Sequence, residues 1–327
     1  MFVVNTLPVA ILFCIVTMLG WGSWANTQKL TGNRKWPFQL FYWDYAIGVF
    51  LLGAILAHTV GGMEISRENL HAAQASYALM ALASGAIFNL SNILLVVGID
   101  AAGMAVAFPV GVGLALVIGT VESYREAPKG NAALLFGGVA LIVVAMVMSA
   151  LAHRRLPHGA GKSPMRGVAY SAAAGCVMGF FYPLLTRGIS PGFNSGPIVP
   201  GMLTPYVALL CFGAGVLVSN LLWNTWFMRT GGVTYREYFH GGARLHAIGI
   251  LGGAIWMLAL TANVLAAGVA GPAISYALGQ GATLVAALWG ILIWREFRAA
   301  PAGTGMLLAL MLAGYTSGLI LIGAATQ

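Results

Sequence analysis

Ten apolar runs of about 20 residues, each nearly free of charge, constrain the fold of this chain more than any other feature of its sequence. A bilayer core is about 30 Å thick, and an α-helix needs about 20 apolar residues to cross it. Only 7% of the residues are charged, against about 25% in a soluble domain, which excludes a water-soluble globule. The runs lie near residues 6–24, 38–60, 75–97, 102–121, 132–152, 167–187, 203–228, 245–267, 272–293 and 303–325.

The basic residues indicate how these helices are oriented. Twelve of the 16 Lys and Arg residues lie in the loops between runs 1 and 2, 5 and 6, 7 and 8, and 9 and 10, and four lie on the opposite side. The positive-inside rule places the first set in the cytoplasm. We therefore expect a cell (inner or plasma) membrane protein with both termini outside the cytoplasm. This distribution explains the net charge of +8 without a nucleic-acid partner. The first run lacks a basic start and is expected to be a retained helix, not a cleaved signal.

Short matching stretches indicate an internal repeat. Tyr124-Arg125-Glu126 and Trp294-Arg295-Glu296 end similar apolar segments about 170 residues apart, and Ser84 to Phe88 matches Gly252 to Trp256. Such self-similarity is typical of transporters built from repeats. Five helices per half is an odd number, so the second half must enter the membrane inverted. We predict an all-α integral membrane fold of ten helices, with inverted five-helix repeats at 1–152 and 166–327 joined by a cytoplasmic linker at 153–165.

Polar residues inside the apolar runs are candidates for a binding site, because polar side chains are costly in lipid and should face the interior of the bundle. Amides can donate and accept hydrogen bonds, and aromatic faces can stack on a ring. Interhelical hydrogen bonding is the competing role of each amide. Glycines, with Pro109 and Pro183, should allow bends around the site. The candidate substrate-binding residues are Trp21, Asn89, Asn92, Asn220, Asn224, Trp256, Tyr276 and Gln280.

Charged residues suggest the type of substrate and its coupling. We find no Lys or Arg in the middle of a run, which favours a neutral substrate, since anionic groups normally need a buried cation. Asp44 and Glu122 lie inside or near the ends of runs and could carry protons. Their competing roles are structural: Asp44 could pair with a loop cation such as Arg34 or Lys35, and Glu122 with Arg125.

The matched Arg-Glu pairs are candidate gate elements, at opposite ends of the bundle if the repeats are inverted. They comprise Arg125 and Glu126 in one half and Arg295 and Glu296 in the other. Local ion pairing is the alternative role.

The remaining reactive and aromatic residues suggest no catalytic chemistry. Cys14, Cys176 and Cys211 lie in apolar runs without a metal or disulfide spacing, so we expect inert core residues and no cofactor or metal. Trp24, Trp36 and Trp43 fit an interfacial aromatic belt. The chain lacks a His-Glu-x-x-His motif and a convincing buried nucleophile with its base, which argues against an enzyme.

Four stretches of the sequence carry a resemblance to a known family. They are Trp21-Gly22-Ser23-Trp24-Ala25-Asn26-Thr27-Gln28-Lys29-Leu30, Phe41-Tyr42-Trp43-Asp44-Tyr45-Ala46-Ile47-Gly48, Gly103-Met104-Ala105-Val106-Ala107-Phe108-Pro109-Val110-Gly111, and Ile274 to Thr283 running into Trp294-Arg295-Glu296. With them the chain resembles, over nearly its whole length, the drug/metabolite transporter superfamily, and more closely its glucose/ribose porter and rhamnose transporter branch, with the ureide permeases nearby. The resemblance implies a five-plus-five helix secondary carrier of a sugar, with proton symport in the rhamnose case, while Asp44-Tyr45 is also similar to ureide permeases.

The sequence thus predicts a secondary active transporter that moves a small neutral polar solute by alternating access. A sugar is the first expectation, with proton symport as its coupling. A ureide or nucleobase permease is the alternative, because amides suit either ligand. A drug/metabolite exporter, a channel and an intramembrane enzyme rank below these.

Overall fold

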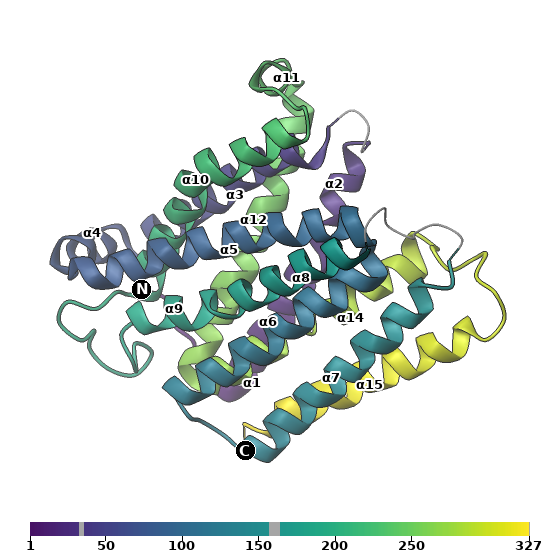
Figure 1. Ribbon diagram of the computed structural model, residues 1–327. Helices are drawn as coiled ribbons and strands as arrows, with labels where there is room; N and C mark the ends of the chain where they lie inside the picture. Colours follow the sequence, from purple (N-terminus) through teal and green to yellow (C-terminus); the bar gives the residue numbers. More distant parts are fainter. Residues whose placement is uncertain (33–35, 157–163, 327) are drawn as a thin grey trace. The chain divides into compact units, whose positions relative to one another are not determined.

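The computed structural model describes residues 1–32, 36–156 and 164–326, and these residues form helices without a named β-strand (Figure 1). The mostly apolar helices satisfy their backbone groups internally, as a lipid environment requires. The elements are α1 (Leu7–Ser23), α2 (Asn26–Leu30), α3 (Phe38–His58), α4 (Met63–Ala72), α5 (Ala75–Ala102), α6 (Met104–Glu126), α7 (Ala132–His153), α8 (Pro164–Gly179), α9 (Phe181–Gly188), α10 (Pro205–Thr230), α11 (Tyr235–Phe239), α12 (Ala243–Ala270), α13 (Pro272–Gly279), α14 (Ala282–Leu288), the π-helix η1 (Trp289–Ile293) and α15 (Thr304–Ala324).

The structure confirms an all-α integral membrane fold. Ten helical segments of its described residues are long and apolar enough to span a bilayer. Their bounds agree closely with the ten runs of the sequence. They are Leu7–Leu30, Phe38–His58, Ala75–Ala102, Ala107–Glu126, Ala132–His153, Met165–Gly188, Pro205–Thr230, Ala243–Ala270, Pro272–Ile293 and Thr304–Ala324.

Three spans are interrupted, and in two of them the local sequence explains the break. The first breaks between α1 and α2 at Trp24 and Ala25. The sixth breaks between α8 and α9 at Phe180, because Pro183 has no N–H to donate to the carbonyl of Gly179 four residues before it. The ninth breaks between α13 and α14 at the Gln280 position, where flanking glycines weaken the helix. By contrast, Pro109 lies inside α6.

The chain divides into two compact units. Unit 1 contains Met1–Asn89 and Leu184–Val269, and unit 2 contains Leu90–Pro183 and Ala270–Gln327. In unit 1, α3 packs along α10, and in unit 2, α7 packs along α15 (Figure 1). These pairs are the second spans and the fifth spans of the two predicted repeats. Each unit therefore combines helices from both sides of the 153–165 linker. The repeat boundaries at 1–152 and 166–327 stay a prediction.

Close helix crossings within unit 1 also repeat. A Cβ atom on Gly48 would overlap the carbonyl oxygen of Ile250 on α12, and one on Gly253 would overlap that of Tyr45 on α3. Small residues allow this backbone approach, which supplies packing energy in a bilayer. Gly85 of α5 and Gly215 of α10 make an equivalent pair of approaches, to Phe212 and Leu82. The α3–α12 crossing thus corresponds to the α10–α5 crossing.

Two long helices share the same ending. Both α5 and α12 have 28 residues, and each is followed by a single glycine that begins the next helix. Gly103 has φ 80° and ψ 155°, and Gly271 has φ 89° and ψ 150°, a conformation that residues with a Cβ rarely adopt. This local geometry supports the predicted internal repeat.

Candidate functional site

Five aromatic rings from five helices gather in unit 1 and form what we call the Trp256 cluster. The Trp256 ring on α12 stacks on Trp21 of α1 with 5.8 Å between ring centroids, and on Phe212 of α10 with 5.7 Å. Phe88 of α5 and Tyr45 of α3 lie 4.2 and 6.4 Å from it. The structure thus brings two predicted ring-stacking residues, Trp21 and Trp256, into direct contact.

Two residues of the Trp256 cluster, and Asn220 farther along α10, carry buried polar atoms. Trp21 Nε1 and Tyr45 OH are buried and have no hydrogen-bond partner among the described residues. Asn220 of α10 is fully buried, and neither its amide nitrogen nor its oxygen has such a partner. Most buried polar atoms in proteins are hydrogen-bonded, so each exception requires an explanation. These atoms could donate to and accept from a polar ligand.

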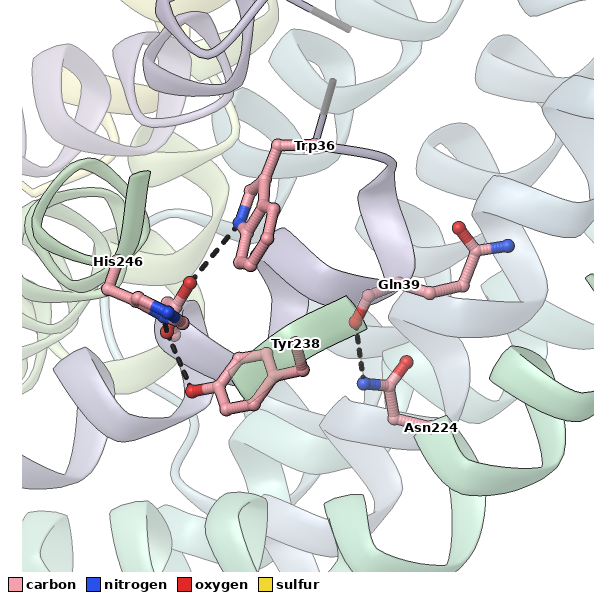
Figure 2. Close-up of polar contacts among 6 residues, drawn as sticks. Trp36, Gln39, Asn224, Tyr238 and His246 are labelled. Carbon is pink, nitrogen blue, oxygen red and sulfur yellow. Dashed lines mark hydrogen bonds and ion pairs between the residues drawn. The ribbon is translucent and has the colours of Figure 1, made fainter. Parts of the chain in front are cut away.

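Asn89 and Asn224 combine a structural role with an unused acceptor. Asn89 donates to the carbonyl of Val216 at 3.2 Å and to Ser219 Oγ at 2.9 Å, which joins α5 to α10. Asn224 donates to the Gln39 carbonyl at 2.9 Å, which joins α10 to α3 (Figure 2). The side-chain oxygens of both asparagines are buried without a partner in the described residues. In both asparagines the amide nitrogen can therefore join two helices while the amide oxygen accepts a hydrogen bond from a ligand.

The other predicted binding residues belong to unit 2. Tyr276 of α13 donates to the carbonyl of Ala115 at 3.2 Å and stacks on Tyr182 with 5.0 Å between ring centroids, so it has a packing role. Gln280 lies at the break between α13 and α14 and is nearly buried. The nitrogen of Asn92 is buried with no hydrogen-bond partner among the described residues.

Asp44 is the centre of a hydrogen-bond network in unit 1, which we call the Asp44 network. Its Oδ1 accepts from Tyr238 OH at 2.7 Å and from His246 Nδ1 at 2.8 Å, and its Oδ2 accepts from Trp36 Nε1 at 3.3 Å. Figure 2 shows the side chains of Trp36, Tyr238 and His246 converging on one place, where dashed lines mark polar contacts. Asp44 is only 1% exposed, so burial is offset by three donors from separate parts of the chain.

Local sequence explains why these side chains converge. Tyr238 lies on α11, a one-turn helix after α10 (Figure 1), and Thr234 and Glu237 start α11 with a reciprocal capping box. Gly249 of α12 faces the Cβ of Asp44, where a side chain would clash. Burial raises the pKa of Tyr238, and its hydrogen bond to Asp44 raises this pKa further, so its phenol stays a donor at neutral pH.

The predicted gate residues lie at helix ends. Glu122 pairs with Arg125 at 3.1 Å, as the i, i+3 spacing predicts, and the Arg125 side chain is 72% exposed, so the pair contributes little to stability. Glu126 is the last residue of α6. Arg295 and Glu296 follow η1, and Arg295 has φ 51°, a left-handed conformation that is uncommon for a residue with a side chain.

Several expectations from sequence need correction or completion. Trp36 and Trp43 are buried, so their assignment to an interfacial belt is wrong: both pack with α11. Cys176 is exposed and is not a core residue, whereas Cys14 and Cys211 are buried.

The proposed loop partners of Asp44, Arg34 and Lys35, lie outside the described residues. Sequence reasoning missed Tyr238 and His246. A signal was present in the aromatic stretch Tyr235–Phe239 and in a histidine near the start of a span. Among the described residues, no group of three His, Cys, Asp or Glu side chains could hold a metal ion.

Comparisons with known proteins point to membrane permeases. No family model matches the chain. Ureide permeases 1 and 3 of Arabidopsis thaliana are each 27% identical to it over 159 residues, and ureide permease 2 is 26% identical over 162 residues. These alignments cover 47% of this chain and 41–46% of the relatives, so the chain matches less than half of the length of each.

A crystal structure of another protein shares the fold. It aligns over 95% of this chain and 96% of its own, with a TM-score of 0.62 and 17% sequence identity. The relatives that this chain resembles in sequence are named permeases, that is, membrane transporters. Membership of the glucose/ribose porter branch stays a prediction.

Proposed function

We propose that this protein is a secondary carrier that moves a small neutral polar solute across a membrane. The observation that carries the proposal is the Trp256 cluster with two buried polar atoms, Trp21 Nε1 and Tyr45 OH, that have no hydrogen-bond partner among the described residues. Both atoms lie on membrane-spanning helices, where an unsatisfied polar group is costly. A solute that supplies hydrogen bonds would recover this cost, while the indole faces would stack on its ring.

The substrate class that we favour is a ureide, with a neutral sugar as the competitor. The curated relatives that resemble this chain are named ureide permeases. A ureide offers N–H and C=O groups to Asn220, whose amide can donate and accept. A sugar offers only hydroxyls, which the same amide can also bind, so the substrate must be decided by measurement.

Contacts at the two ends of unit 1 support the proposed topology. The Asp44 network joins the segment before α3 to the segment between α10 and α12. At the opposite ends of these helices, Gln74 N donates to the Gly201 carbonyl at 2.9 Å and Asn69 donates to the Met202 carbonyl at 2.9 Å. Loops 1–2 and 7–8 thus share one side, as the positive-inside distribution requires. We assign that side to the cytoplasm of the cell membrane and both termini to the outside.

The pseudo-symmetric packing supports alternating access, because inverted repeats can exchange conformations across the membrane. In this proposal the Arg125–Glu126 and Arg295–Glu296 pairs act as gates at the two ends. The binding roles of Asn92, Tyr276 and Gln280, which belong to unit 2, stay a prediction from the sequence.

Counterflow in proteoliposomes tests the proposal. Vesicles loaded with an unlabelled ureide, sugar or nucleobase should accumulate external label of the same compound, because a carrier exchanges solutes. Thermal denaturation in the same compounds should show stabilisation of about 2.7 kcal/mol at a ligand concentration of 100 Kd.

Replacing a tryptophan of the site provides a matched control. Trp256→Phe should reduce counterflow at least tenfold, whereas Trp226→Phe should not, because Trp226 is an exposed residue of α10. Equal activity of both variants would remove the Trp256 cluster as the binding site, and stimulation by sugars alone would replace the ureide assignment.

A further inference from the structure

The Asp44 network connects a buried carboxylate to a partly exposed imidazole. The His246 side chain is 25% exposed, whereas the Asp44 side chain is 1% exposed. An ionised carboxylate can only accept hydrogen bonds, so the His246 Nδ1 that lies 2.8 Å from it carries a proton. The other ring nitrogen, Nε2, lies beside Gly241, where a Cβ atom would be only 2.8 Å from it. A side chain at this position would overlap both Nε2 and the Trp36 ring, so the glycine leaves room for the imidazole.

The same carboxylate holds α11 in place. Tyr238 of α11 donates to Asp44 Oδ1, the oxygen that also accepts from His246. The Tyr238 ring further contacts Trp36 and His246, with centroid distances of 6.0 and 4.8 Å. A helix of five residues has little stability of its own, so these contacts decide whether α11 stays docked.

We propose that Asp44 and His246 form the proton-binding site of this protein and that its occupancy releases α11 from α3. Water protonates His246 at Nε2, and the Nδ1 proton passes to Asp44. His246 returns to its neutral form with the proton on Nε2, so one proton is taken up in total. The protonated carboxyl accepts hydrogen bonds more weakly than the carboxylate, so the Tyr238 bond to Oδ1 is weakened. Tyr238 and Trp36 are positioning residues in this scheme.

Other charged groups near the network do not replace Asp44 as the titrating group. The nearby charged groups are all exposed: Arg236 and Glu237 of α11, His240 directly after it, Arg244 of α12 and Arg229 at the end of α10. Glu237 caps its own helix, and the His240 ring contacts the carbonyl of Arg236. The groups that hydrogen-bond to Asp44 among the described residues are Tyr238, His246 and Trp36. Of these, the imidazole has a second ring nitrogen that can accept a proton while the first donates one.

Hydrogen exchange of α11 tests the release without any substrate. The full-length protein in lipid nanodiscs is exchanged at a series of pH values, corrected for intrinsic exchange, while infrared spectroscopy detects the protonated carboxyl. As the pH falls and Asp44 becomes protonated, protection of the α11 peptide should fall by roughly 10-fold to 100-fold, the usual effect of a hydrogen bond to a charged acceptor. The wild-type carboxyl band should be absent in Asp44→Asn.

Variants separate the roles of the three residues. Asp44→Asn and Tyr238→Phe should each show low α11 protection at every pH, and Tyr238→Phe removes only a hydroxyl, so it keeps the test valid if Asp44→Asn does not fold. His246→Gln retains a donor to Asp44 and should keep α11 docked at neutral pH, but should slow its release after a pH jump at least tenfold. Tyr235→Phe is the control, because the Tyr235 hydroxyl contacts Thr225 instead.

The proposal is overturned if α11 protection does not follow carboxyl protonation or if Tyr238→Phe retains wild-type protection. A release rate in His246→Gln equal to that of the wild type would remove the histidine from the proton path. A role of this site in coupling proton uptake to solute transport rests on the proposed carrier function. It is tested separately, by measuring the pH dependence of solute uptake. Loss of pH-dependent uptake in Asp44→Asn would support it. The absence of uptake with a normal exchange profile would reject the carrier function, while the proposed release of α11 would still stand.

Discussion

Replacing Asn220 with leucine separates a binding residue from a structural one. Asn220 is fully buried, and both polar atoms of its side chain lack a partner among the described residues. Leucine has a similar size and no polar atoms. If the asparagine serves a transported solute, the variant should be more stable than the wild type and inactive, because binding sites often conserve groups that cost stability.

The size of the effect follows from the hydrogen bonds of the two asparagines. A buried polar group without a partner costs about 1–3 kcal/mol, and no bond between Asn220 and the described residues would be lost. We therefore expect Asn220→Leu to raise the free energy of unfolding by at least about 1 kcal/mol. Asn89 donates two hydrogen bonds, each worth about 0.6 kcal/mol in a membrane. In Asn89→Leu, the loss of these two hydrogen bonds offsets the gain from removing the side-chain oxygen that has no partner among the described residues. The free energy of unfolding should therefore change little.

The measurement is reversible unfolding of both variants in mixed micelles, together with ligand-induced stabilisation and counterflow. Asn220→Leu should gain stability without ligand, lose stabilisation by ligand and show no counterflow. A destabilisation of Asn220→Leu as large as that of a lost interhelical bond would refute the reasoning, since it would reveal a structural partner. Normal counterflow in this variant would exclude Asn220 from the binding site.

Three further predictions concern packing, ion pairing and pH. Gly253→Ala should destabilise the protein by about 1–3 kcal/mol in the same unfolding assay, because its Cβ overlaps a backbone carbonyl. Gly137→Ala should not, since nothing lies within 4 Å of that position. Glu122→Gln should change the unfolding free energy by less than about 1 kcal/mol, because the pair with Arg125 is solvent-exposed, and a larger loss would indicate a buried gate. Burial and Asp44 raise the pKa of Tyr238, so the docking of α11 that depends on its phenol should persist above the usual tyrosine value of about 10 and be lost as the pH rises through the higher value. Hydrogen exchange at alkaline pH checks this, and Tyr238→Phe should lack that transition.

The number and limits of the membrane spans could be predicted from sequence because each span is a local property of about 20 residues. The breaks within the spans were partly predictable for the same reason, because Pro183 and the glycines beside Gln280 weaken a helix locally, whatever the tertiary structure around them. The role of Trp36 was not predictable in this way, because an amphipathic aromatic near a span end fits a lipid interface as well as a buried network. Its burial depends on α11, which follows it by about 200 residues in the sequence.

The candidate site shows the same division between local and distant information. Helical spacing correctly placed Glu122 beside Arg125, because i, i+3 neighbours share a face. Spacing could not reveal that Trp21 stacks on Trp256, nor that Asp44 bonds to His246, since such pairs depend on which helices pack together. The sequence did identify Trp21, Trp256 and Asp44 individually, because polar and aromatic residues beside glycines inside apolar runs are unusual.

The length of α5 and α12 has a consequence for the lipid in which the protein is studied. At 1.5 Å per residue, 28 residues extend about 42 Å, whereas a hydrocarbon core is about 30 Å thick. Each helix must tilt or extend into the headgroup region. Asp100 near the end of α5 and Arg244 near the start of α12 are exposed charges that favour the headgroups. A mismatch between helix length and bilayer thickness costs a fraction of a kcal/mol per Å. The acyl-chain length of the lipid should therefore change the relative stability of the protein's conformations. Counterflow rates of the same purified protein should therefore differ between vesicles with thin and with thick bilayers.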